Sequence, residues 1–538
     1  MTKPILKNCS RRSLLSAGAL VLATAYPVQA AGPSQDELDR SAAATDTWLM
    51  TNKSYDGSRY VALDQINASN VSGLKEACTL DSAVEAPAQS SPVLYDGHIF
   101  LSVGQTTLAI DATSCKVIWR HEWTLKGKAL SKPNRGVAIK DGRVVRGTSD
   151  GYLIAIGMAD GKLLWEHQVT SAENSHYLSM PAMIVDDRVI YGTAGADWGS
   201  RGWIGAFRLD NGEELWRYNA LPAAGEPGAD TWGSPEALAH GGGSFWTPVS
   251  VDRAAGIVYV PVGNPAPDFY GDLRKGTNLY TNAAVALDLK SGKPLWAKQF
   301  VAHDERDWDL SQTSPLVTAE IDGKAHNLIV VSGKDGRLRL VDRDTHDVLH
   351  DIALSKQENV EAPVTVEGVH ICPGLLGGQE WSSSAYDATR HIVISPMVNW
   401  CGTAHRDSEA PVHKVGDHYY GGKIVQDPIE QSRGVLSAVD ISTGAVSWKT
   451  ETAAPMLANV TPTAGGIVFA GDLGGTLYAV SSDTGEVLLR RPMGASAGGG
   501  LFSYALGGRQ FVAVVSGPVS PFFGGGNGTA KLTLLTLP

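Results

Sequence analysis

An eleven-residue pattern, Ala-x5-Gly-x3-Trp, recurs along this chain and constrains its fold more than any other feature. Four copies are complete and three keep the spacing but have lost one or all of the pattern's residues; the copies begin at Ala109, Ala155, Ala206, Ala286, Leu340, Ala438 and Ala479. Self-similarity over tens of residues is typical of propellers and solenoids. Short β-branched and aromatic runs, such as residues 189–191 and 257–260, precede a turn containing Gly and then the Trp segment. This is the order of an antiparallel meander, so the pattern predicts an all-β fold, a β-propeller.

The two ends of the chain are predicted to share the last blade. Residues 74–78 read as an outer strand with no copy of the pattern before it, whereas residues 461–479 and 501–537 are rich in strand-forming residues. Seven copies and this split blade predict an eight-bladed propeller. Joining the first and last strands in this way removes free sheet edges.

The cysteines fit the same geometry. Cys78 stands where the Trp of the pattern would fall, and Cys115 stands where the Gly of the next copy would fall. If each Trp packs on the Gly of the following blade, a Cys78–Cys115 disulfide replaces one such contact; two small buried thiols are the alternative. Cys372 and Cys401 bracket a predicted strand pair and are also expected to bond. An even number of cysteines after the leader suits an oxidising compartment.

The N-terminus reads as an export signal. Residues 1–30 combine a basic start, an apolar stretch at residues 14–23 and a small-residue cleavage site that ends at Ala30. Cleavage there would leave residues 31–538 as one propeller domain in the periplasm. Residues 10–15, Ser-Arg-Arg-Ser-Leu-Leu, also resemble a twin-arginine signal, so two export routes stay open. No later segment reaches membrane-spanning length.

Charge and missing motifs exclude several classes of partner and cofactor. The net charge of −11 argues against nucleic acid or an anionic membrane surface. No dinucleotide-binding fingerprint precedes a predicted helix, which argues against NAD. The chain contains no Cys-x-x-Cys-His, so no haem c is expected to be attached covalently.

Candidate functional residues lie off the repeat, in Gly- and Pro-rich segments between the blades. Four of them offer hard oxygen donors: Asp197, Asn264, Asp307 and Asp309. Asp307 and Asp309 are two residues apart and are expected to share one side of an extended segment. Oxygen donors without His or Cys suit Ca²⁺ or a similar hard cation, and Trp246 offers a flat face for a planar cofactor. Taken singly, each Asp is explained by a turn, and the Trp by packing between blades. Several such loops that converge on the propeller axis favour a metal and cofactor site instead.

These segments resemble those of the pyrroloquinoline-quinone (PQQ) dependent alcohol dehydrogenases, the quinoproteins that include methanol dehydrogenase. The matching segments are residues 58–71, 134–136 (Asn-Arg-Gly), 195–197 (Gly-Ala-Asp), 241–246, 263–267 (Gly-Asn-Pro-Ala-Pro), 303–304, Asp307 and 342–343. The repeat is similar to the family's tryptophan-docking motif on an eight-bladed propeller. The resemblance implies a periplasmic, PQQ- and metal-dependent dehydrogenase that oxidises an alcohol to an aldehyde or ketone. It also implies that electrons pass to a separate acceptor such as cytochrome c.

The resemblance assigns roles residue by residue. Trp246 would form the floor under the PQQ ring, and Asp307 would be the general base that takes the alcohol proton as hydride passes to the quinone C5. The groups implied to bind PQQ are Arg135, Ser179, Ser244, Lys334, Gln89 (where many members have Glu) and the backbone of Ala194, Gly195 and Ala196. Asp197 and Asn264 would ligate the metal, with Asp307 and Asp309 beside it.

The metal set departs from the family pattern. The family has Glu where this chain has Asp197, one methylene shorter. Asp309 is an additional carboxylate; in methanol dehydrogenases an Asp there is associated with lanthanide use, but the membrane glucose dehydrogenases carry one with ordinary cations. We therefore favour Ca²⁺, with a lanthanide as the alternative.

The pocket also departs from the family pattern. The adjacent-cysteine ring found in many relatives is absent, with Ala129 and Leu130 at its positions, and Arg306 replaces a common Trp. Arg306 is expected to place positive charge near the mouth, and residues 222–238 and 402–423 are expected to set access. These features predict a secondary or bulky alcohol over methanol. The alternatives are a sugar or polyol dehydrogenase and a non-enzymatic propeller scaffold, although a scaffold has no need of this donor set.

Overall fold

The computed structural model describes residues 1–2, 32–524 and 528–538. Within these residues, no helix has the length and apolar character needed to cross a membrane. The predicted signal peptide falls almost entirely on residues 3–31, which lie outside the described residues, as do residues 525–527.

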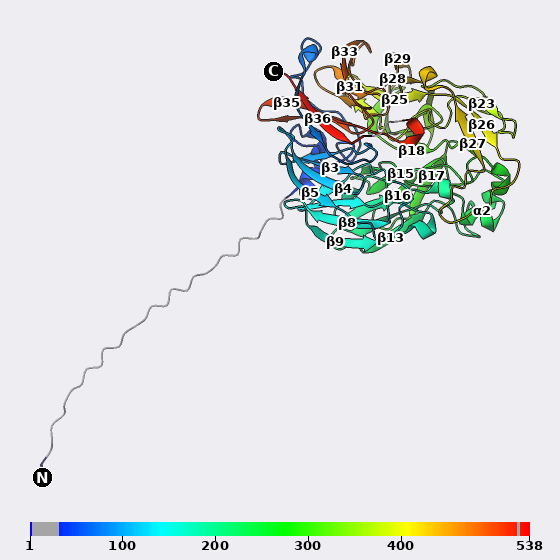
Figure 1. Cartoon of the computed structure of the whole chain (residues 1–538), viewed down its shortest axis with the longest axis horizontal. Coiled ribbons are helices and arrows are strands. Elements are labelled where there is room, and N and C mark those ends of the chain that lie inside the picture. The colour runs from blue at the N-terminus through cyan, green and yellow to red at the C-terminus, as the bar shows by residue number, and fades with distance from the viewer. Residues whose placement is uncertain (3–31, 525–527) are drawn as a thin grey trace.

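Eight antiparallel sheets follow one another around a ring in the described chain, and Figure 1 shows them as a colour sequence from blue through green to red. The first four blades are formed by β2 (Val93–Tyr95), β3 (His98–Val103), β4 (Thr106–Asp111) and β5 (Val117–Glu122); β6 (Ala138–Lys140), β7 (Arg143–Gly147), β8 (Tyr152–Gly157) and β9 (Leu163–Gln168); β10 (Met183–Val185), β11 (Arg188–Gly192), β12 (Trp203–Arg208) and β13 (Glu214–Asn219); and β14 (Ser250–Asp252), β15 (Ile257–Val262), β16 (Ala283–Asp288) and β17 (Pro294–Gln299). The predicted meander order of the blades is confirmed.

The other four blades complete the ring. They are formed by β18 (Leu310–Gln312), β20 (Lys324–Gly333), β21 (Arg337–Asp342) and β22 (Val348–Ala353), with β19 (Leu316–Ile321) added beside β20; β24 (Ala385–Asp387), β25 (Ile392–Asn399), β28 (Arg433–Asp440) and β29 (Val446–Thr452); β30 (Thr461–Pro462), β31 (Ile467–Gly471), β32 (Thr476–Ser481) and β33 (Val487–Pro492); and β34 (Leu501–Leu506), β35 (Arg509–Ser516), β36 (Lys531–Thr536) and β1 (Lys75–Asp81). The predicted eight-bladed propeller is therefore confirmed.

Little of the described chain is helical. The helices are α1 (Gln35–Asp39) and α2 (Pro235–Ala239), and the 3₁₀ turns are η1 (Ser41–Ala43), η2 (Val71–Gly73), η3 (Ala172–Asn174), η4 (Ala196–Trp198), η5 (Ala229–Trp232), η6 (Gly271–Arg274), η7 (Ile429–Gln431) and η8 (Pro521–Phe523). The core lies between neighbouring blades, so the inner strands β3 and β4 are almost wholly buried, whereas the outer strand β9 is partly exposed along its length. Burial on both faces explains why the inner strands read as continuous apolar runs.

The repeated pattern joins each blade to the next. The Trp119 ring packs on the Gly161 backbone, and the Trp216 ring packs on Gly292, where an added Cβ would overlap the ring. The Trp216 Nε1–H also donates to the Leu289 carbonyl over 3.1 Å. The same contact recurs at Trp165 with Gly212 and at Trp448 with Gly485. Where the pattern has lost its Gly and Trp, histidines take their places; Trp296 packs against His346 with ring centroids 4.7 Å apart.

The ring is closed by both ends of the chain. β1 pairs antiparallel with β36, with Lys75 opposite Thr536, as predicted for a shared blade. A disulfide between Cys78 and Cys115 then joins β1 to the turn after β4. Cys78 and Cys115 therefore occupy the docking position that Trp and Gly fill elsewhere, which confirms the prediction.

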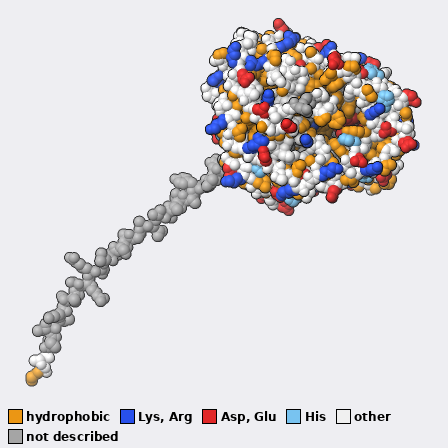
Figure 2. All heavy atoms as spheres, in the orientation of Figure 1, with side chains coloured by type: hydrophobic (Ala, Val, Ile, Leu, Met, Phe, Trp, Pro, Cys, Tyr) orange, Lys and Arg blue, Asp and Glu red, His pale blue; other side chains and the backbone are white. Residues whose placement is uncertain are grey.

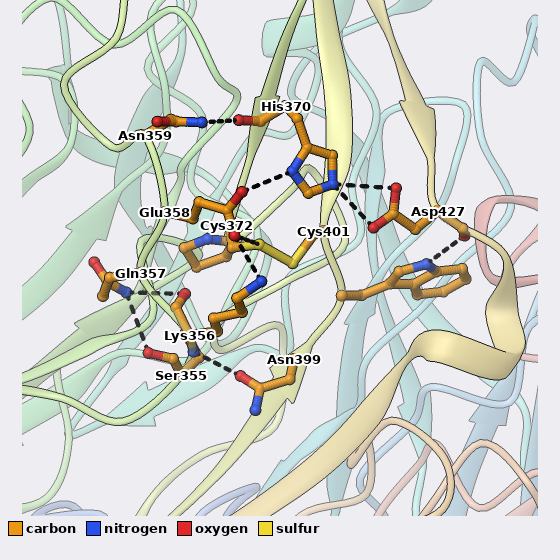
Figure 3. The surroundings of a disulfide bond; sticks show 12 residues. Ser355, Lys356, Gln357, Glu358, Asn359, His370, Cys372, Asn399, Cys401 and Asp427 are labelled. Atoms are coloured by element: carbon orange, nitrogen blue, oxygen red, sulfur yellow. Dashed lines mark hydrogen bonds and ion pairs between the residues drawn. A yellow bond between two sulfur atoms is a disulfide. The ribbon is translucent and has the colours of Figure 1, made fainter.

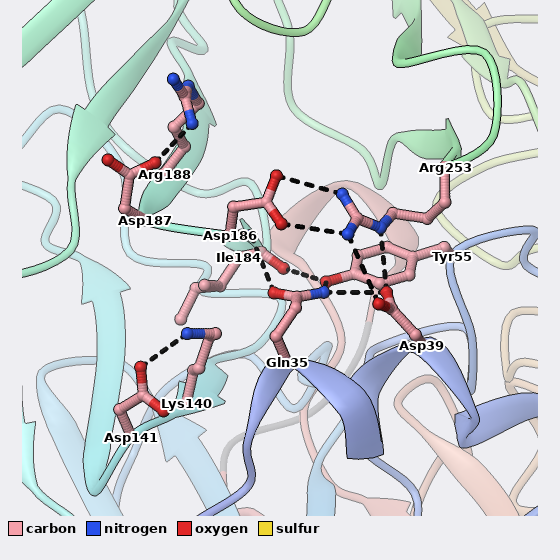
Figure 4. Close-up of polar contacts among 10 residues, drawn as sticks. All are labelled: Gln35, Asp39, Tyr55, Lys140, Asp141, Ile184, Asp186, Asp187, Arg188 and Arg253. Atoms are coloured by element: carbon pink, nitrogen blue, oxygen red, sulfur yellow. Dashed lines mark hydrogen bonds and ion pairs between the residues drawn. The ribbon is translucent and has the colours of Figure 1, made fainter.

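The segment before the first blade ties several blades together (Figure 4). The Gln35 side chain donates to the Tyr55 hydroxyl, which in turn donates to the Ile184 carbonyl over 2.7 Å. The Arg253 guanidinium binds Asp39 at 2.9 Å and Asp186 at 3.0 Å. Helix α1 is thereby fixed to the turns of the third and fourth blades.

A three-stranded sheet stands outside the repeat; its strands are β23 (Val369–Ile371), β26 (Gly402–Arg406) and β27 (Gly422–Gln426). β23 precedes the sixth blade, and β26 and β27 are inserted between its strands β25 and β28. The predicted Cys372–Cys401 disulfide lies at its base (Figure 3) and is confirmed. Beside it, the His370 ring lies between Asp427 at 3.0 Å and Glu358 at 3.2 Å. Hydrogen bonds to these two carboxylates raise the pKa of His370. The insert matters for function because its β26–β27 connection reaches the cavity described next.

Candidate active site

A cavity of about 450 Å³ lies where the inter-blade loops converge. Figure 2 shows a hollow in the face drawn, with hydrophobic side chains gathered around it. Most residues predicted for the site line this cavity: Gln89, Arg135, Ala194, Gly195, Asp197, Ser244, Trp246, Asp307, Asp309 and Lys334. The other three lie directly behind them. Ser179 accepts a hydrogen bond from Arg135 over 2.9 Å, Asn264 donates its backbone N–H to Asp309 over 3.0 Å, and Ala196 precedes Asp197 in η4.

The Trp246 ring forms a flat surface with two cations near it. The Arg135 guanidinium lies 4.5 Å from the ring centroid and the Lys334 ammonium 5.8 Å. Burial lowers the pKa of Arg135 to about 10, so Arg135 stays charged at neutral pH. A planar aromatic ring that carries negative groups at its edge fits this arrangement, because it can stack on Trp246 while its anionic groups meet the two cations.

Lys334 is the centre of the charge network. Its ammonium lies 3.2 Å from Asp307 Oδ2 and 2.8 Å from Asp309 Oδ2. Burial acts to lower the pKa of Lys334, but Asp307 and Asp309 raise it well above its ordinary value. Asp307 adopts a φ of 58°, so the segment is not extended as predicted, yet both carboxylates still reach the same lysine.

Glycines allow the loops to approach one another here. A Cβ at Gly263 would overlap the Asp309 carboxylate, and a Cβ at Gly195 would overlap the Ser175 carbonyl. Gly195 also has a φ of 129°, which a residue with a side chain rarely adopts. The Gly-rich segments singled out in the sequence are thus required by close packing around the carboxylates.

Three carboxylates meet at one point beside the Trp246 floor. One carboxylate oxygen from each of Asp197, Asp268 and Asp307 lies within 4.8 Å of the others. Burial raises the pKa of Asp197, and burial raises the pKa values of Asp268 and Asp307 well above the ordinary range. Bringing these charges together without a cation is unfavourable, since like charges in a buried site repel strongly.

Buried oxygens in this cluster have no hydrogen-bond partner among the described residues. They are Asn264 Oδ1, Asp307 Oδ1, both carboxylate oxygens of Asp268, and the side-chain carbonyl or carboxyl oxygens of Gln89 and Glu380. Buried oxygens normally have partners, and a hard cation with six to eight oxygen ligands supplies them. The Arg135 Nε–H is likewise unpartnered and suits an acidic ligand group. The residues present therefore fit both a hard metal ion and an anionic planar cofactor.

Sequence reasoning missed several residues that line the cavity or lie beside it. Asp268 directly follows the segment 263–267. This position, next to a segment already singled out, was the signal that could have added it to the other carboxylates of the site. Tyr420 and His418 come from the predicted access loop 402–423 and stack on each other with centroids 4.6 Å apart. The 3₁₀ turn η8 brings Phe522 and Phe523 to the wall, and nothing in its local sequence pointed there.

Two expectations about the mouth are wrong. No described lining residue comes from residues 222–238, which were expected to set access. The Arg306 side chain does not line the cavity either; it donates to the Ala362 carbonyl and lies 5.2 Å from the centroid of the Trp308 ring. The Trp308 ring and the Ala362 carbonyl hold this guanidinium within the wall, so it does not project into the mouth.

Family comparisons agree with the fold and the cavity. The family model described as glucose/ethanol/alcohol dehydrogenase, β-propeller domain, matches residues 48–361. A second model, described as outer membrane protein assembly factor BamB, matches only residues 432–517. The first match contains every residue that the sequence predicted for the site, from Gln89 to Lys334, whereas the second covers only later blades.

Individual relatives match along most of their length. Quinohemoprotein alcohol dehydrogenase ADH IIB of Pseudomonas putida is 28% identical, over 96% of this chain and 79% of the relative. Quinoprotein alcohol dehydrogenase PedH of Pseudomonas putida is 27% identical, over 87% of this chain and 86% of the relative. The solved quinohemoprotein alcohol dehydrogenase from Comamonas testosteroni superposes with a TM-score of 0.85 at 26% identity, over 94% of this chain and 82% of that one. A europium-containing methanol dehydrogenase shares the fold, with a TM-score of 0.86 at 23% identity, over 93% of this chain and 100% of that one.

Proposed function

Because the chain belongs to the family of PQQ-dependent alcohol dehydrogenase propellers, we propose that it oxidises a bulky or secondary alcohol in the periplasm. The product is a ketone or aldehyde, and the electrons leave to a separate acceptor such as cytochrome c. One observation carries the proposal most directly. Arg135, Lys334 and the Trp246 face meet a cluster of carboxylates with unpartnered oxygens in one cavity.

The residues around Trp246 would hold PQQ. Arg135, held by Ser179, and Lys334 would bind its acidic edge, while Ser244, Gln89 and the backbone of residues 194–196 line the same wall. When bound, PQQ supplies the two-electron acceptor and the metal polarises its carbonyl. The protein's part is to orient the ring against the floor and to place the charges.

Asp307 is proposed as the base. Its Oδ2 is held by Lys334 at 3.2 Å, whereas its Oδ1 has no described partner. Oδ1 is therefore the atom that takes the alcohol proton. Lys334 favours the ionised form of this carboxylate against the effect of burial, which keeps it basic when the site is filled.

We propose Ca²⁺ as the metal, held by Asp197 and Asn264, with Asp307 and Asp309 beside it. Both Asp309 oxygens already have partners, because Oδ2 contacts Lys334 and Oδ1 accepts the Asn264 N–H. Asp309 then acts mainly by positioning these neighbours, which supports an ordinary cation. A lanthanide is the alternative, and metal replacement distinguishes the two.

The apolar rim supports a bulky alcohol as substrate. Leu130, at one of the positions of the missing cysteine ring, lines the cavity together with Leu375, Leu376, Ile424 and Phe522. Burying alkyl or aryl carbon against this surface contributes about 25 cal/mol for each Å², and methanol offers little of it.

Two disulfides support export to an oxidising compartment. We accordingly propose that residues 1–30 are the signal peptide and that residues 31–538 form the mature propeller domain. The scaffold alternative is weak, because a scaffold gains nothing from buried unpartnered oxygens.

The decisive experiment is dye-linked alcohol oxidation by the purified, EDTA-treated protein. PQQ is added alone, with Ca²⁺ or with La³⁺, and kcat/KM is measured for methanol, 1-butanol, 2-butanol, benzyl alcohol and glucose. We expect activity only with PQQ and metal together, highest with Ca²⁺ and with the larger alcohols. Methanol or glucose as the best substrate would overturn the substrate assignment. If the protein neither binds PQQ nor oxidises any of these alcohols, the non-enzymatic scaffold would become the preferred function.

A further inference from the structure

Asp268 is the least explained charged residue of the cavity region. Its side chain is 0% exposed, and neither carboxylate oxygen has a hydrogen-bond partner among the described residues. A buried carboxylate is unfavourable by several kcal/mol unless it is paired or coordinates a metal. A residue that contributes only to packing would be apolar here, so the carboxylate calls for a partner.

The nearest cations are engaged elsewhere. Arg274 donates from Nε to the Pro267 carbonyl, from Nη1 to Asn278, and from Nη2 to the backbone carbonyls of Asp268 and Asp304. It therefore contacts the main chain of Asp268 and not the carboxylate. Lys334 is bound to Asp307 and Asp309. No described side chain forms a salt bridge with the Asp268 carboxylate.

The geometry instead points to a shared ion. An Asp268 oxygen lies within 4.8 Å of an oxygen of Asp197 and an oxygen of Asp307. Oxygens that ligate one Ca²⁺-sized ion lie about 2.3–2.6 Å from it, so two of them are at most about 5 Å apart. All three carboxylates can therefore reach the same cation. Asp197 is already proposed to hold the metal, and Asp307 lies beside it.

We propose that Asp268 is an additional ligand of the metal in the PQQ site, an assignment that rests on the proposed function. A third carboxylate offsets the short side chain of Asp197, which places its oxygens about one methylene further from the ion than a Glu would. It also raises the negative charge around the ion. A trivalent ion should then depend on Asp268 more than Ca²⁺ does, because the attraction grows with the product of the charges.

The test measures metal binding and not turnover. The PQQ-loaded full-length mature protein is titrated with Eu³⁺ and separately with Ca²⁺, and europium emission lifetimes in H₂O and D₂O count the water molecules bound to the ion. Asp268→Ala removes the carboxylate, and Asp268→Asn keeps its volume but removes its charge. Asp272→Asn is the matched control, because it removes a carboxylate four residues away whose side chain is 61% exposed.

We expect Asp268→Ala to add at least one europium-bound water. It should weaken Eu³⁺ binding about tenfold or more, since even groups that only support a metal ligand contribute about 10- to 100-fold to affinity. Asp268→Asn should weaken Eu³⁺ more than Ca²⁺, and Asp272→Asn should change neither. An unchanged water count, with affinities equal to those of Asp272→Asn, would overturn the assignment.

Unfolding temperatures separate a ligand from a structural residue. Because the Asp268 carboxylate makes no described hydrogen bond, Asp268→Asn should not lower the Tm of the metal-free protein, but it should reduce the rise in Tm on adding metal. A lower metal-free Tm with an unchanged metal response would contradict the proposal. Failure of the wild-type protein to bind PQQ and Eu³⁺ would refute the proposed function itself. Normal wild-type binding with no effect at Asp268 would refute only this inference.

Discussion

At the scale of single residues, the cavity is organised by a lysine between two carboxylates. Lys334 holds one oxygen each of Asp307 and Asp309, and Asp309 in turn holds the Asn264 backbone. Burial raises the pKa of the neighbouring Glu380 to about 7, the strongest of several influences on it. The site thus places one free carboxylate oxygen, on Asp307, beside a fixed positive charge.

Asp307→Asn should leave PQQ and metal bound but lower kcat about 100-fold or more, because the amide cannot accept the alcohol proton. Stopped-flow reduction of the PQQ-loaded variant measures this step separately from electron transfer to the dye. Asp272→Asn, an exposed carboxylate outside the cavity, is the control and should react normally. A variant at Asp307 with near wild-type kcat would remove this residue from the role of base.

Site residues could be predicted from the sequence when an oxygen donor lies within a Gly- or Pro-rich loop, as Asp197 and Asn264 do. It did not predict Asp268 or Tyr420, because their roles depend on which distant loops meet at the axis. Arg306 shows the same limit in reverse. The sequence shows its charge. It does not show that the Ala362 carbonyl and the Trp308 ring hold the side chain inside the cavity wall.

At the scale of elements, the blades are held in register by an aromatic ring on a glycine. The repeat therefore predicted the blades and their order with little ambiguity. The insert β23, β26 and β27 carries no copy of the pattern, so the repeat did not predict a sheet there. Elements that pack outside the repeat are defined by their own tertiary contacts.

Gly292→Ala should destabilise the protein more than Gly256→Ala, although φ is 69° at the first and 67° at the second. Both variants should lose about 1–2 kcal/mol from left-handed backbone strain. A Cβ at Gly292 would also overlap the Trp216 ring, adding roughly 1–3 kcal/mol, whereas Gly256 has no atoms within 4 Å of the added carbon. Urea denaturation followed by Trp fluorescence compares the two. Equal losses would mean that the docking contact contributes little.

At the scale of the whole molecule, the closing blade unites residues 75–81 with the last strand of the chain. The prediction of this closure succeeded because the sequence at one end lacked a blade's inner strands and the other end lacked its outer strand. The Cys78–Cys115 disulfide strengthens the joint at the position where a Trp docks elsewhere.

Replacing Cys78 and Cys115 together by Ser should lower the free energy of unfolding by about 4 kcal/mol, the chain-entropy contribution for a separation of 37 residues. Hydrogen exchange should quicken in β1 and β36. Replacing Cys372 and Cys401 together, 29 residues apart, should lower stability similarly but quicken exchange in the insert instead. Unchanged protection of β1 in the first variant would show that strand pairing alone seals the ring.

The cavity takes its walls from Pro87 near the start of the first blade and from Phe523 in the last. The lining residues come from both the first and the last blade, so we expect the proposed quinone site to be complete only after β36 has paired with β1. A chain whose ring is still open should then bind no PQQ and oxidise no alcohol.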